Sequence, residues 1–151
     1  MAAPERTFAP PLVRLTVPQY EAVVAHCYDG LPDEACGMLA GPVDAAGDPT
    51  GVITAVYPCT NADASARTYT VDSRDLIRAM RDAESRSEEL VAVWHSHTHS
   101  DAYPSDTDVR QALEPNWVYV LVSLKHAEPV VRGYRIRDGV VTECELVVAD
   151  P

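Results

Sequence analysis

The sequence predicts a single α/β domain in which helices pack on the faces of a mixed β-sheet. In the first two thirds of the chain, helical patterns alternate with short apolar runs that are typical of strands. The last third holds three further apolar runs, and Asp138-Gly139 between the last two indicates a hairpin and therefore antiparallel strands. A chain of 151 residues with 46% hydrophobic residues can bury one sizeable core. We expect residues 12–151 to form this domain and residues 1–11 to be a flexible, Pro-rich leader.

Charge and composition exclude several classes of partner. The chain has 12 basic and 23 acidic residues, a net charge of −11, so it should repel the phosphates of nucleic acids. No apolar run approaches the ~20 residues that cross a bilayer, and residues 1–11 lack the apolar core of a signal peptide. We therefore expect a cytoplasmic protein with no membrane partner.

The cysteines give no sign of a structural metal site. The four of them contain no Cys-x-x-Cys pair, which argues against a zinc knuckle. In a protein without an export signal, scattered cysteines are expected to be thiols rather than disulfides. They are Cys27, Cys36, Cys59 and Cys144.

The first elements are a strand and a helix. Residues 12–17 alternate in a way that suits a half-buried strand. Thr16 and Gln19 then form a capping-box pattern, with Pro18 tolerated in the first turn, and the helix should run to about Tyr28 before Asp29-Gly30 ends it. Its buried face should contain Tyr20, Val23, Val24 and Cys27.

The next stretch predicts a strand pair and an irregular connection. Residues 34–41 are apolar inside and read as a buried strand, followed by a turn over residues 42–50 and a pairing strand over 51–57. Residues 58–67 form a polar loop that either only connects elements or lines a substrate groove. Residues 68–71 read as one more short strand.

A second helix should follow Asp72 and Ser73, which can cap its first turn. The residues at helical spacing that should form its buried stripe are Leu76, Ile77, Met80 and Ala83. Beyond it come an apolar strand, a short helix that Pro115 stops, and three strands. Their ranges are 90–94, 106–113, 117–124, 130–137 and 140–148.

Two histidines directly after the apolar run of residues 90–94 are the main candidate for a metal site. Side chains alternate along a strand, so His95 and His97 should point to the same side. Asp108 is the best candidate for a third ligand. Two nitrogens and one oxygen suit a catalytic Zn²⁺, which keeps its fourth position for water.

A local explanation competes for part of this motif. Ser105-x-x-Asp108 before a helix is close to a capping box, which would account for both residues without a metal. The two explanations are compatible, because an aspartate in the first turn of a helix can also face the histidines. The full pattern His-x-His-x7-Ser-x2-Asp is expected by chance in roughly one chain in several thousand of this size, so its occurrence favours a metal site.

His99 offers a different histidine pair with His97. If His97 and His99 were the ligand pair, the positions corresponding to Ser105 and Asp108 in the motif would be Thr107 and Arg110. An arginine cannot ligate zinc. We therefore expect His99 to be a bystander on the loop. The lone His26 in the first helix is expected to be a surface or core histidine.

Glu34 and Cys36 leave alternatives open. Glu34 stands at the mouth of an apolar strand, where it is either a solvated carboxylate or a general base beside the metal. Cys36 shares its strand parity, so it is either a small buried apolar residue or a thiol that faces the same pocket.

The combined motif resembles the JAMM (MPN+) metalloproteases. Its parts are Glu34 in Pro-Asp-Glu-Ala-Cys-Gly-Met-Leu-Ala-Gly and His95-Ser-His97-x7-Ser105-x2-Asp108. The resemblance implies a cytidine-deaminase-like three-layer fold, with a mixed sheet between helices. It also implies that zinc is held by His95, His97 and Asp108, that Glu34 is the catalytic base and that Ser105 helps to hold the oxyanion.

Further segments are similar to the actinobacterial Mec branch of this family, and the similarity covers roughly residues 13–148. They include residues 69–73, Ala-Tyr-Pro-Ser at residues 102–105, Tyr-Val-Leu-Val-Ser at 119–123 and Tyr-Arg-Ile at 134–136. This branch implies a peptidase that acts on a ubiquitin-like sulfur carrier protein with a Gly-Gly tail and releases cysteine from its C-terminus.

Two other functions remain open at this point. The first is a zinc hydrolase of the same type that acts on another ubiquitin-like or peptide conjugate. The second is a non-catalytic scaffold of the same fold, although such members usually lack part of the metal set and this chain keeps all five positions. The Pro-Cys-x-x-Cys half-site of the deaminases is absent, which argues against nucleoside deamination.

Overall fold

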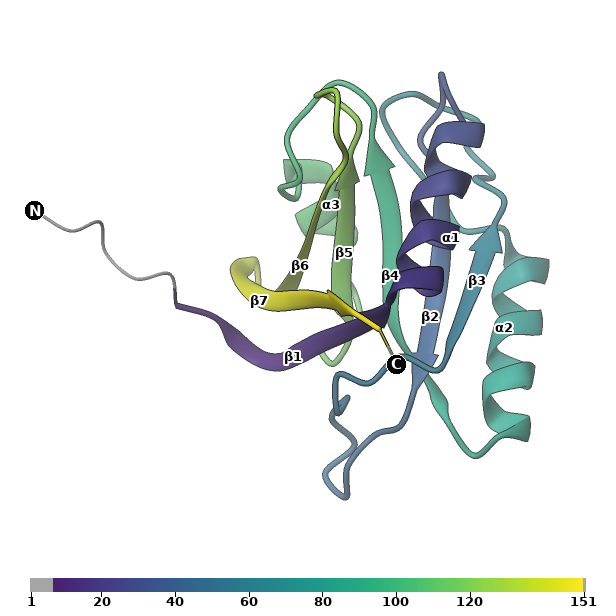
Figure 1. Ribbon diagram of the computed structural model, residues 1–151, viewed down its shortest axis with the longest axis vertical. Coiled ribbons are helices and arrows are strands. Elements are labelled where there is room, and N and C mark those ends of the chain that lie inside the picture. Colours follow the sequence, from purple (N-terminus) through teal and green to yellow (C-terminus); the bar gives the residue numbers. More distant parts are fainter. Residues whose placement is uncertain (1–6, 151) are drawn as a thin grey trace, which may run out of the picture.

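The computed structural model describes residues 7–150, and these form a seven-stranded mixed sheet with three helices (Figure 1). The elements are β1 (Ala9–Thr16), α1 (Val17–Asp29), β2 (Cys36–Gly41), β3 (Ala55–Cys59), α2 (Ser73–Ser85), β4 (Glu89–His97), α3 (Asp106–Gln111), β5 (Val118–Ser123), β6 (Val130–Arg137) and β7 (Val140–Ala149). Their order across the sheet is β1-β7-β6-β5-β4-β2-β3. Two neighbouring pairs are parallel, β1 with β7 and β4 with β5, and the other neighbours are antiparallel. The predicted mixed sheet is therefore confirmed.

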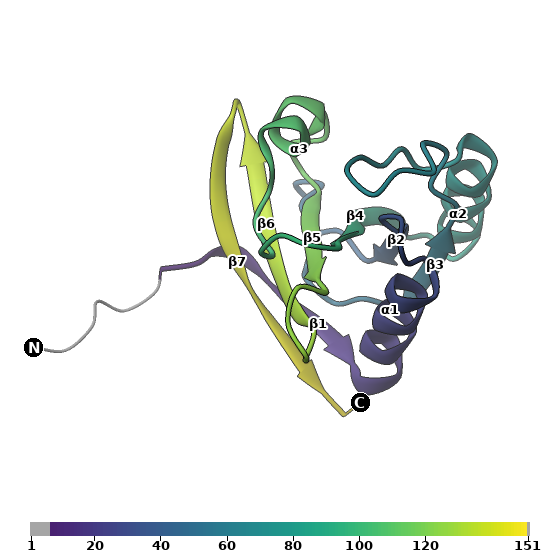
Figure 2. The same ribbon diagram turned by 90° about the horizontal axis from the view of Figure 1, so that it is seen from above.

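The sheet is strongly curved and separates two helical layers. Figure 2 shows α1 against one face and α2 and α3 on the opposite side. Val23 and Cys27 of α1 pack on the first face against Trp94. On the second face Ala79 of α2 packs in a cluster with Met38 and other buried side chains. Each face of the sheet therefore has its own apolar core.

From Ala92 onward, the central strand β4 directs its side chains alternately to these two cores. Trp94 lies in the core under α1, and Val93 lies in the core on the α2 and α3 side. Continued alternation brings His95 and His97 to the α2 and α3 side and Ser96 to the α1 side. The prediction that both histidines share one side is thereby confirmed.

The local signals at the ends of elements are confirmed. Gln19 N donates to Thr16 Oγ1 at 3.2 Å and Thr16 N donates to Gln19 Oε1 at 3.0 Å, which completes the capping box of α1. Asp72 caps α2 through the amides of its first turn. Asp138 and Gly139 have φ values of 51° and 77°, the left-handed conformation that a tight hairpin turn requires.

Strand β1 begins earlier than predicted. Ala9 already pairs with Cys144 of β7, so residues 9–11 belong to the strand and not to the leader. The alternation of side chains that predicts the strand starts only after Pro10 and Pro11, and it contains no sign that the preceding residues pair with β7. Residues 1–6 of the predicted leader lie outside the described part of the chain.

Two predictions between β2 and α2 need correction. The second strand pairs with β2, as predicted, but it covers Ala55–Cys59 instead of residues 51–57. Gly51 has φ +94° and its carbonyl accepts a hydrogen bond of 2.8 Å from Arg14 N, so this segment turns toward β1 before β3 starts. Residues 68–71 form no strand, because only the isolated bridge between Asn61 and Val71 occurs there.

The buried stripe of α2 is also rotated relative to the prediction. Ala79 and Ala83 are buried against the sheet, whereas Ile77 and Met80 are 47% and 44% exposed. Small alanine side chains allow the helix to approach the sheet closely, and this contact turns the larger flanking side chains outward. Ala83 is buried and Leu76 is partly buried, as predicted.

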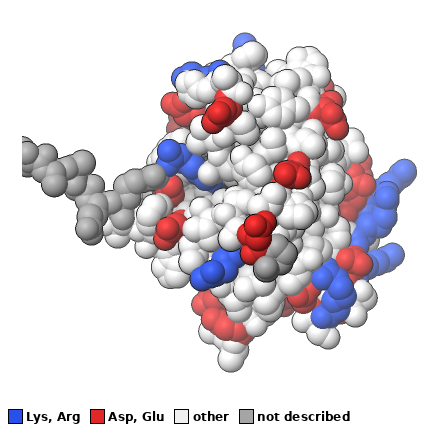
Figure 3. Space-filling view, in the orientation of Figure 1, with Lys and Arg blue, Asp and Glu red and all other residues white. Residues whose placement is uncertain are grey.

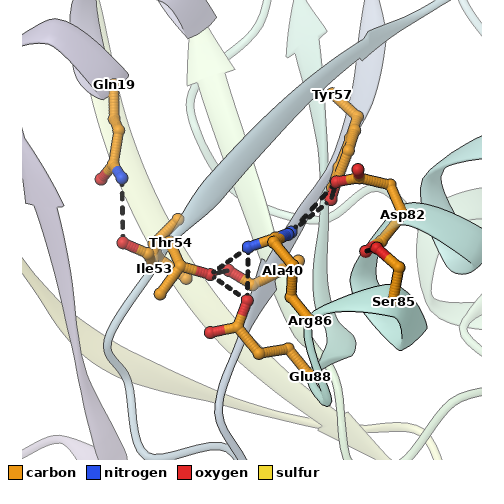
Figure 4. Close-up of polar contacts among 9 residues, drawn as sticks. All are labelled: Gln19, Ala40, Ile53, Thr54, Tyr57, Asp82, Ser85, Arg86 and Glu88. Carbon is orange, nitrogen blue, oxygen red and sulfur yellow. Dashed lines mark hydrogen bonds and ion pairs between the residues drawn. The ribbon is translucent and has the colours of Figure 1, made fainter.

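A polar network fixes the C-terminal end of α2 to the neighbouring edge strand (Figure 4). The Tyr57 hydroxyl of β3 donates to Asp82 and accepts from Arg86 Nη2, the latter at 2.6 Å. Arg86 also contacts Thr54, which directly precedes β3, and Glu88, which directly precedes β4. These contacts help to set the rotation of α2 on the sheet.

Charged side chains are scattered over the face of the molecule in Figure 3, and no single acidic patch dominates it. Several basic side chains lie at the edge where Figure 1 draws α2. No helix of residues 7–150 is long and apolar enough to cross a membrane.

Candidate metal centre

Three predicted ligands meet at the end of β4. The Nε2 atoms of His95 and His97 lie 3.2 Å apart, and Asp108 Oδ2 lies 3.2 Å from the first and 3.1 Å from the second. Both histidines are buried, and the Asp108 side chain is only 11% exposed. The structure therefore brings His95, His97 and Asp108 into one cluster.

The first turn of α3 holds Asp108 in this position. Asp108 N donates to Ser105 Oγ at 3.1 Å, and Ser105 N donates to Asp108 Oδ2 at 2.9 Å. This is the capping box that the sequence offered as an alternative to a metal site. The same carboxylate oxygen that caps the helix also faces both histidines, so one geometry accommodates both explanations.

The atoms of this cluster fit a metal ion. His97 Nδ1 lies 2.8 Å from the carbonyl oxygen of Asp101, which can only accept, so Nδ1 carries a proton and the neutral ring presents a lone pair at Nε2. Lone pairs of a nitrogen and a carboxylate oxygen 3.1 Å apart repel each other unless a proton or a cation lies between them. Two imidazoles and a carboxylate are a common ligand set for a divalent transition metal.

The three groups also perturb each other's protonation. Burial would raise the pKa of Asp108, but its hydrogen bonds with His95 and His97 outweigh burial and hold that pKa far below the usual range. Burial lowers the pKa of His95. Burial acts in the same direction on His97, but Asp108 and the Asp101 carbonyl raise the pKa of His97 overall. The carboxylate is thus held as an anion, which is the form that binds a metal.

The ring of Tyr69 covers His95. The two rings are stacked, with their centroids 4.1 Å apart and an angle of 19° between their planes. His95 Nδ1 is buried and has no hydrogen-bond partner among residues 7–150. The orientation of His95 is therefore fixed by packing, whereas that of His97 is fixed by a hydrogen bond.

Glu34 is buried beside the cluster. It is only 6% exposed, and its Oε1 has no hydrogen-bond partner in the described part of the chain. Burial raises the pKa of Glu34 to about 7, while His97 lowers it and Asp108 raises it through electrostatic interaction. The solvated loop-end carboxylate that we considered is excluded by this burial. An unpaired buried carboxylate oxygen next to a metal-type cluster is suited to bind a water molecule or a substrate proton.

Several polar contacts hold the backbone of Glu34, and the sequence analysis missed them. Asn61 Nδ2 donates to the Glu34 carbonyl at 2.9 Å, and Glu34 N donates to the Ser65 carbonyl at 2.8 Å. The next amide, Ala35 N, donates to Ser96 Oγ at 2.8 Å. The loop of residues 58–67 therefore supports Glu34. The only sequence signal for Ser96 was its place between the two histidines.

Three other candidates lie outside the cluster. His99 is exposed on the loop after β4. The Cys36 thiol is fully buried near Cys59, and burial raises its pKa to about 12, so it is protonated at neutral pH. His26 Nε2 is hydrogen-bonded to the Cys59 carbonyl at 2.9 Å, as expected of a structural histidine. All four cysteines are free thiols, as predicted.

A mainly apolar groove of about 390 Å³ lies on the side of the sheet that carries the cluster. Tyr69, which stacks on His95, belongs to its wall. Its outer part includes Leu113, whose side chain is 82% exposed, and Trp117. Tyr69 therefore links the groove to the cluster.

Residues 16–137 match the family model of prokaryotic homologs of the JAB domain. The chain is 46% identical over 123 residues to the CysO-cysteine peptidases of Mycobacterium bovis and Mycobacterium tuberculosis, with 81% of each chain covered. It is 33% identical over 108 residues to the desampylase of Haloferax volcanii, covering 68% of this chain and 74% of that protein.

Solved structures have the same architecture. The solution structure of a Desulfitobacterium hafniense protein has a TM-score of 0.82 and 31% identity, and it covers 93% of this chain and 94% of its own. A JAB1/MPN domain protein of Archaeoglobus fulgidus has a TM-score of 0.57 at 16% identity, covering 91% of this chain and 100% of its own, which supports the fold alone.

Proposed function

This chain belongs to the family of prokaryotic homologs of the JAB domain, and on that basis we propose that it is a zinc metallopeptidase that acts on a ubiquitin-like sulfur carrier protein. The reaction is hydrolysis of the peptide bond that follows the Gly-Gly tail of the carrier, and it releases cysteine. Relatives that are 46% identical over 81% of the chain are named CysO-cysteine peptidases, which supports this choice of substrate.

The observation that carries the proposal is the convergence of His95, His97 and Asp108 within hydrogen-bonding distance of one another, beside the buried Glu34. A non-catalytic scaffold has no need for a buried carboxylate whose Oε1 lacks a partner within residues 7–150. Burial of such a group lowers stability, and catalysis is a reason to retain it.

In the proposed mechanism, His95, His97 and Asp108 hold zinc through Nε2, Nε2 and a carboxylate oxygen. When bound there, zinc acts as a Lewis acid that polarises a carbonyl and makes water acidic near neutral pH. Glu34 accepts a proton from the attacking water on its carboxylate and later delivers it to the amino group of the leaving cysteine. Such acid–base catalysis typically contributes about 10² to 10⁴ in rate.

Ser105 is proposed to stabilise the oxyanion. Its Oγ accepts a hydrogen bond from Asp108 N, and its own hydroxyl proton is then available to donate to a substrate oxygen. Its position as the N-cap of α3 ties this donor to the ligand Asp108. Loss of an oxyanion donor typically costs about 10² to 10³ in turnover.

A second candidate is cleavage of a ubiquitin-like protein from another protein. The relative from Haloferax volcanii is named a desampylase, and one from Thermus thermophilus, which is 30% identical over 93 residues, is named a probable TtuB-protein conjugate cleaving protease. In both reactions we propose that the tail of the carrier binds in the groove beside Tyr69, so the two candidates differ only beyond the scissile bond.

The test uses the zinc-loaded protein and one carrier prepared in three forms. The first form ends in Gly-Gly-Cys, the second ends in Gly-Gly-Ala, and the third is joined through Gly-Gly to a lysine side chain of another protein. Products are weighed by mass spectrometry over time. We expect fastest cleavage of the first form. Preferred cleavage of the third supports the second candidate, and cleavage of none by a zinc-loaded protein contradicts both.

A further inference from the structure

The loop between the two parts of the metal cluster is anchored at three consecutive carbonyl groups. Each of their oxygens accepts a hydrogen bond from a side chain of a different sheet strand. The pairs are Ser100 O with Ser123 Oγ of β5 at 2.6 Å, Asp101 O with His97 Nδ1 of β4 at 2.8 Å, and Ala102 O with the Tyr134 hydroxyl of β6. We call these three contacts the carbonyl clamp.

The middle contact of the carbonyl clamp controls how His97 can ligate. Because Asp101 O holds the proton on Nδ1, the lone pair of His97 is directed from Nε2 toward His95 and Asp108. If Asp101 O moved away, the ring could rotate or adopt the other tautomer. The position of this carbonyl therefore sets the metal affinity of His97.

The outer two contacts help to fix the position of that carbonyl, which also accepts a hydrogen bond of 2.8 Å from Tyr103 N. Ser123 is 2% exposed, and its Oγ also accepts from Lys125 N at 3.3 Å, so the hydroxyl proton is directed to Ser100 O. Tyr134 is 3% exposed, and its ring also lies edge-on to Tyr103 with centroids 5.4 Å apart. Both donors are rigid because they are buried in the sheet and held by a second contact.

The clamp also determines where the third ligand sits. Residues 100–102 lie between His97 and Ser105, which caps the helix that carries Asp108. Ser123 and Tyr134 donate their hydroxyl protons to carbonyls of this loop, so both can act on the cluster through the loop.

We propose that Ser123 and Tyr134 are positioning residues of the metal centre, which set its affinity by fixing the carbonyls on both sides of Asp101. This inference rests on the proposed function only in so far as His95, His97 and Asp108 bind a metal. Partners that orient a ligating histidine typically contribute about 10- to 100-fold to metal affinity.

The experiment compares zinc affinity and the visible spectrum of the Co²⁺-substituted protein in wild type, Tyr134→Phe, Ser123→Ala and the control Tyr119→Phe. Tyr119 is 6% exposed on β5, is paired with Tyr134 across the sheet, and binds the backbone of Glu114 through its hydroxyl. The control therefore also removes the hydroxyl oxygen of a buried tyrosine on a strand, but this hydroxyl does not belong to the carbonyl clamp. Thermal unfolding of each metal-free variant is measured in parallel.

We expect Tyr134→Phe and Ser123→Ala to bind zinc at least tenfold more weakly than wild type and to shift the Co²⁺ spectrum, whereas Tyr119→Phe does neither. Equal zinc affinity and unchanged spectra in both clamp variants overturn the inference while leaving the peptidase proposal intact. An equal loss in Tyr119→Phe also overturns it, because the effect would then follow general stability. A wild-type protein that binds no metal contradicts the metal centre and the clamp together.

Discussion

Ala35 and Ser96 are joined by two hydrogen bonds in opposite directions. Ala35 N donates to Ser96 Oγ at 2.8 Å, and Ser96 N donates to the Ala35 carbonyl at 2.9 Å. Because Ser96 lies between the two histidines and Ala35 follows Glu34, this pair couples the proposed base to the proposed ligands. It does so from the opposite face of β4.

Replacing Ser96 should therefore impair catalysis more than metal binding. In Ser96→Ala the amide of Ala35 loses its buried acceptor, which typically lowers the free energy of unfolding by about 1 to 3 kcal/mol. We expect kcat to fall by roughly tenfold with bound zinc unchanged, since Glu34 loses its fixed position. Ser96→Thr, which keeps the hydroxyl, should retain more activity. Steady-state kinetics and metal analysis test this, and an unchanged kcat in Ser96→Ala would show that the coupling is unimportant.

Glu34→Gln should separate catalysis from metal binding. The amide has nearly the same shape but cannot accept and return a proton, so turnover should fall by about 10² to 10⁴ while zinc content stays at the wild-type value. Asp33→Asn makes the same charge change one residue earlier and should remain active. A Glu34→Gln enzyme with normal turnover would exclude Glu34 as the base.

His97→Ala should lose both metal and activity, because it removes one of three ligands as well as the donor to Asp101 O. The matched control is His99→Ala, since His99 is exposed on the same loop outside the cluster. Zinc content after dialysis and activity on the carrier are the two measurements. A zinc-loaded His97→Ala protein would remove this residue from the ligand set.

The groove gives a prediction that concerns substrate binding alone. Leu113 is 82% exposed, so Leu113→Ser should leave thermal stability unchanged. It removes apolar surface that the carrier tail would cover, so KM should rise several-fold with little change in kcat. Val148→Ser, which alters an exposed valine of β7 away from the groove, should leave KM unchanged. Equal KM values for both variants would place the carrier elsewhere.

The parts of the fold and the site that depend on local geometry could be predicted from the sequence. His95 and His97 share a side because strands alternate, and the capping box places Asp108 in the first turn of a helix. Neither inference needs knowledge of another element. The motif then indicated that the two segments meet.

Features that depend on distant pairing could not be predicted. Ser96 and Ala35 are 61 positions apart, and Tyr134 and Ala102 are 32 apart, so no local pattern connects them. The start of β1 at Ala9 follows from its pairing with β7, and the rotation of α2 follows from close packing of Ala79. In each case a contact made by the folded sheet decides between local alternatives.

The pKa of Glu34 leads to a prediction for the metal-free protein. Burial raises that pKa from 4.5 to about 7, so folding favours the protonated form. Below pH 4.5 the group is protonated in both states and has no effect on stability. Between pH 4.5 and about 7 the unfolded chain gives up this proton while the folded protein keeps it, so the metal-free protein loses stability over this range. Above pH 7 the loss stays constant at about 3 kcal/mol at most.

Glu34→Gln removes this penalty because its side chain is neutral at every pH. We expect the chelator-treated variant to have nearly the stability of the wild type near pH 4.5 and to exceed it by up to about 3 kcal/mol at pH 8. Urea unfolding at both pH values measures the difference, and Asp33→Asn, at a side chain that is not buried, should show no such gain. If Glu34→Gln is no more stable than wild type at pH 8, the carboxylate is solvated in the metal-free protein, and its pairing with the metal cluster has to be reconsidered.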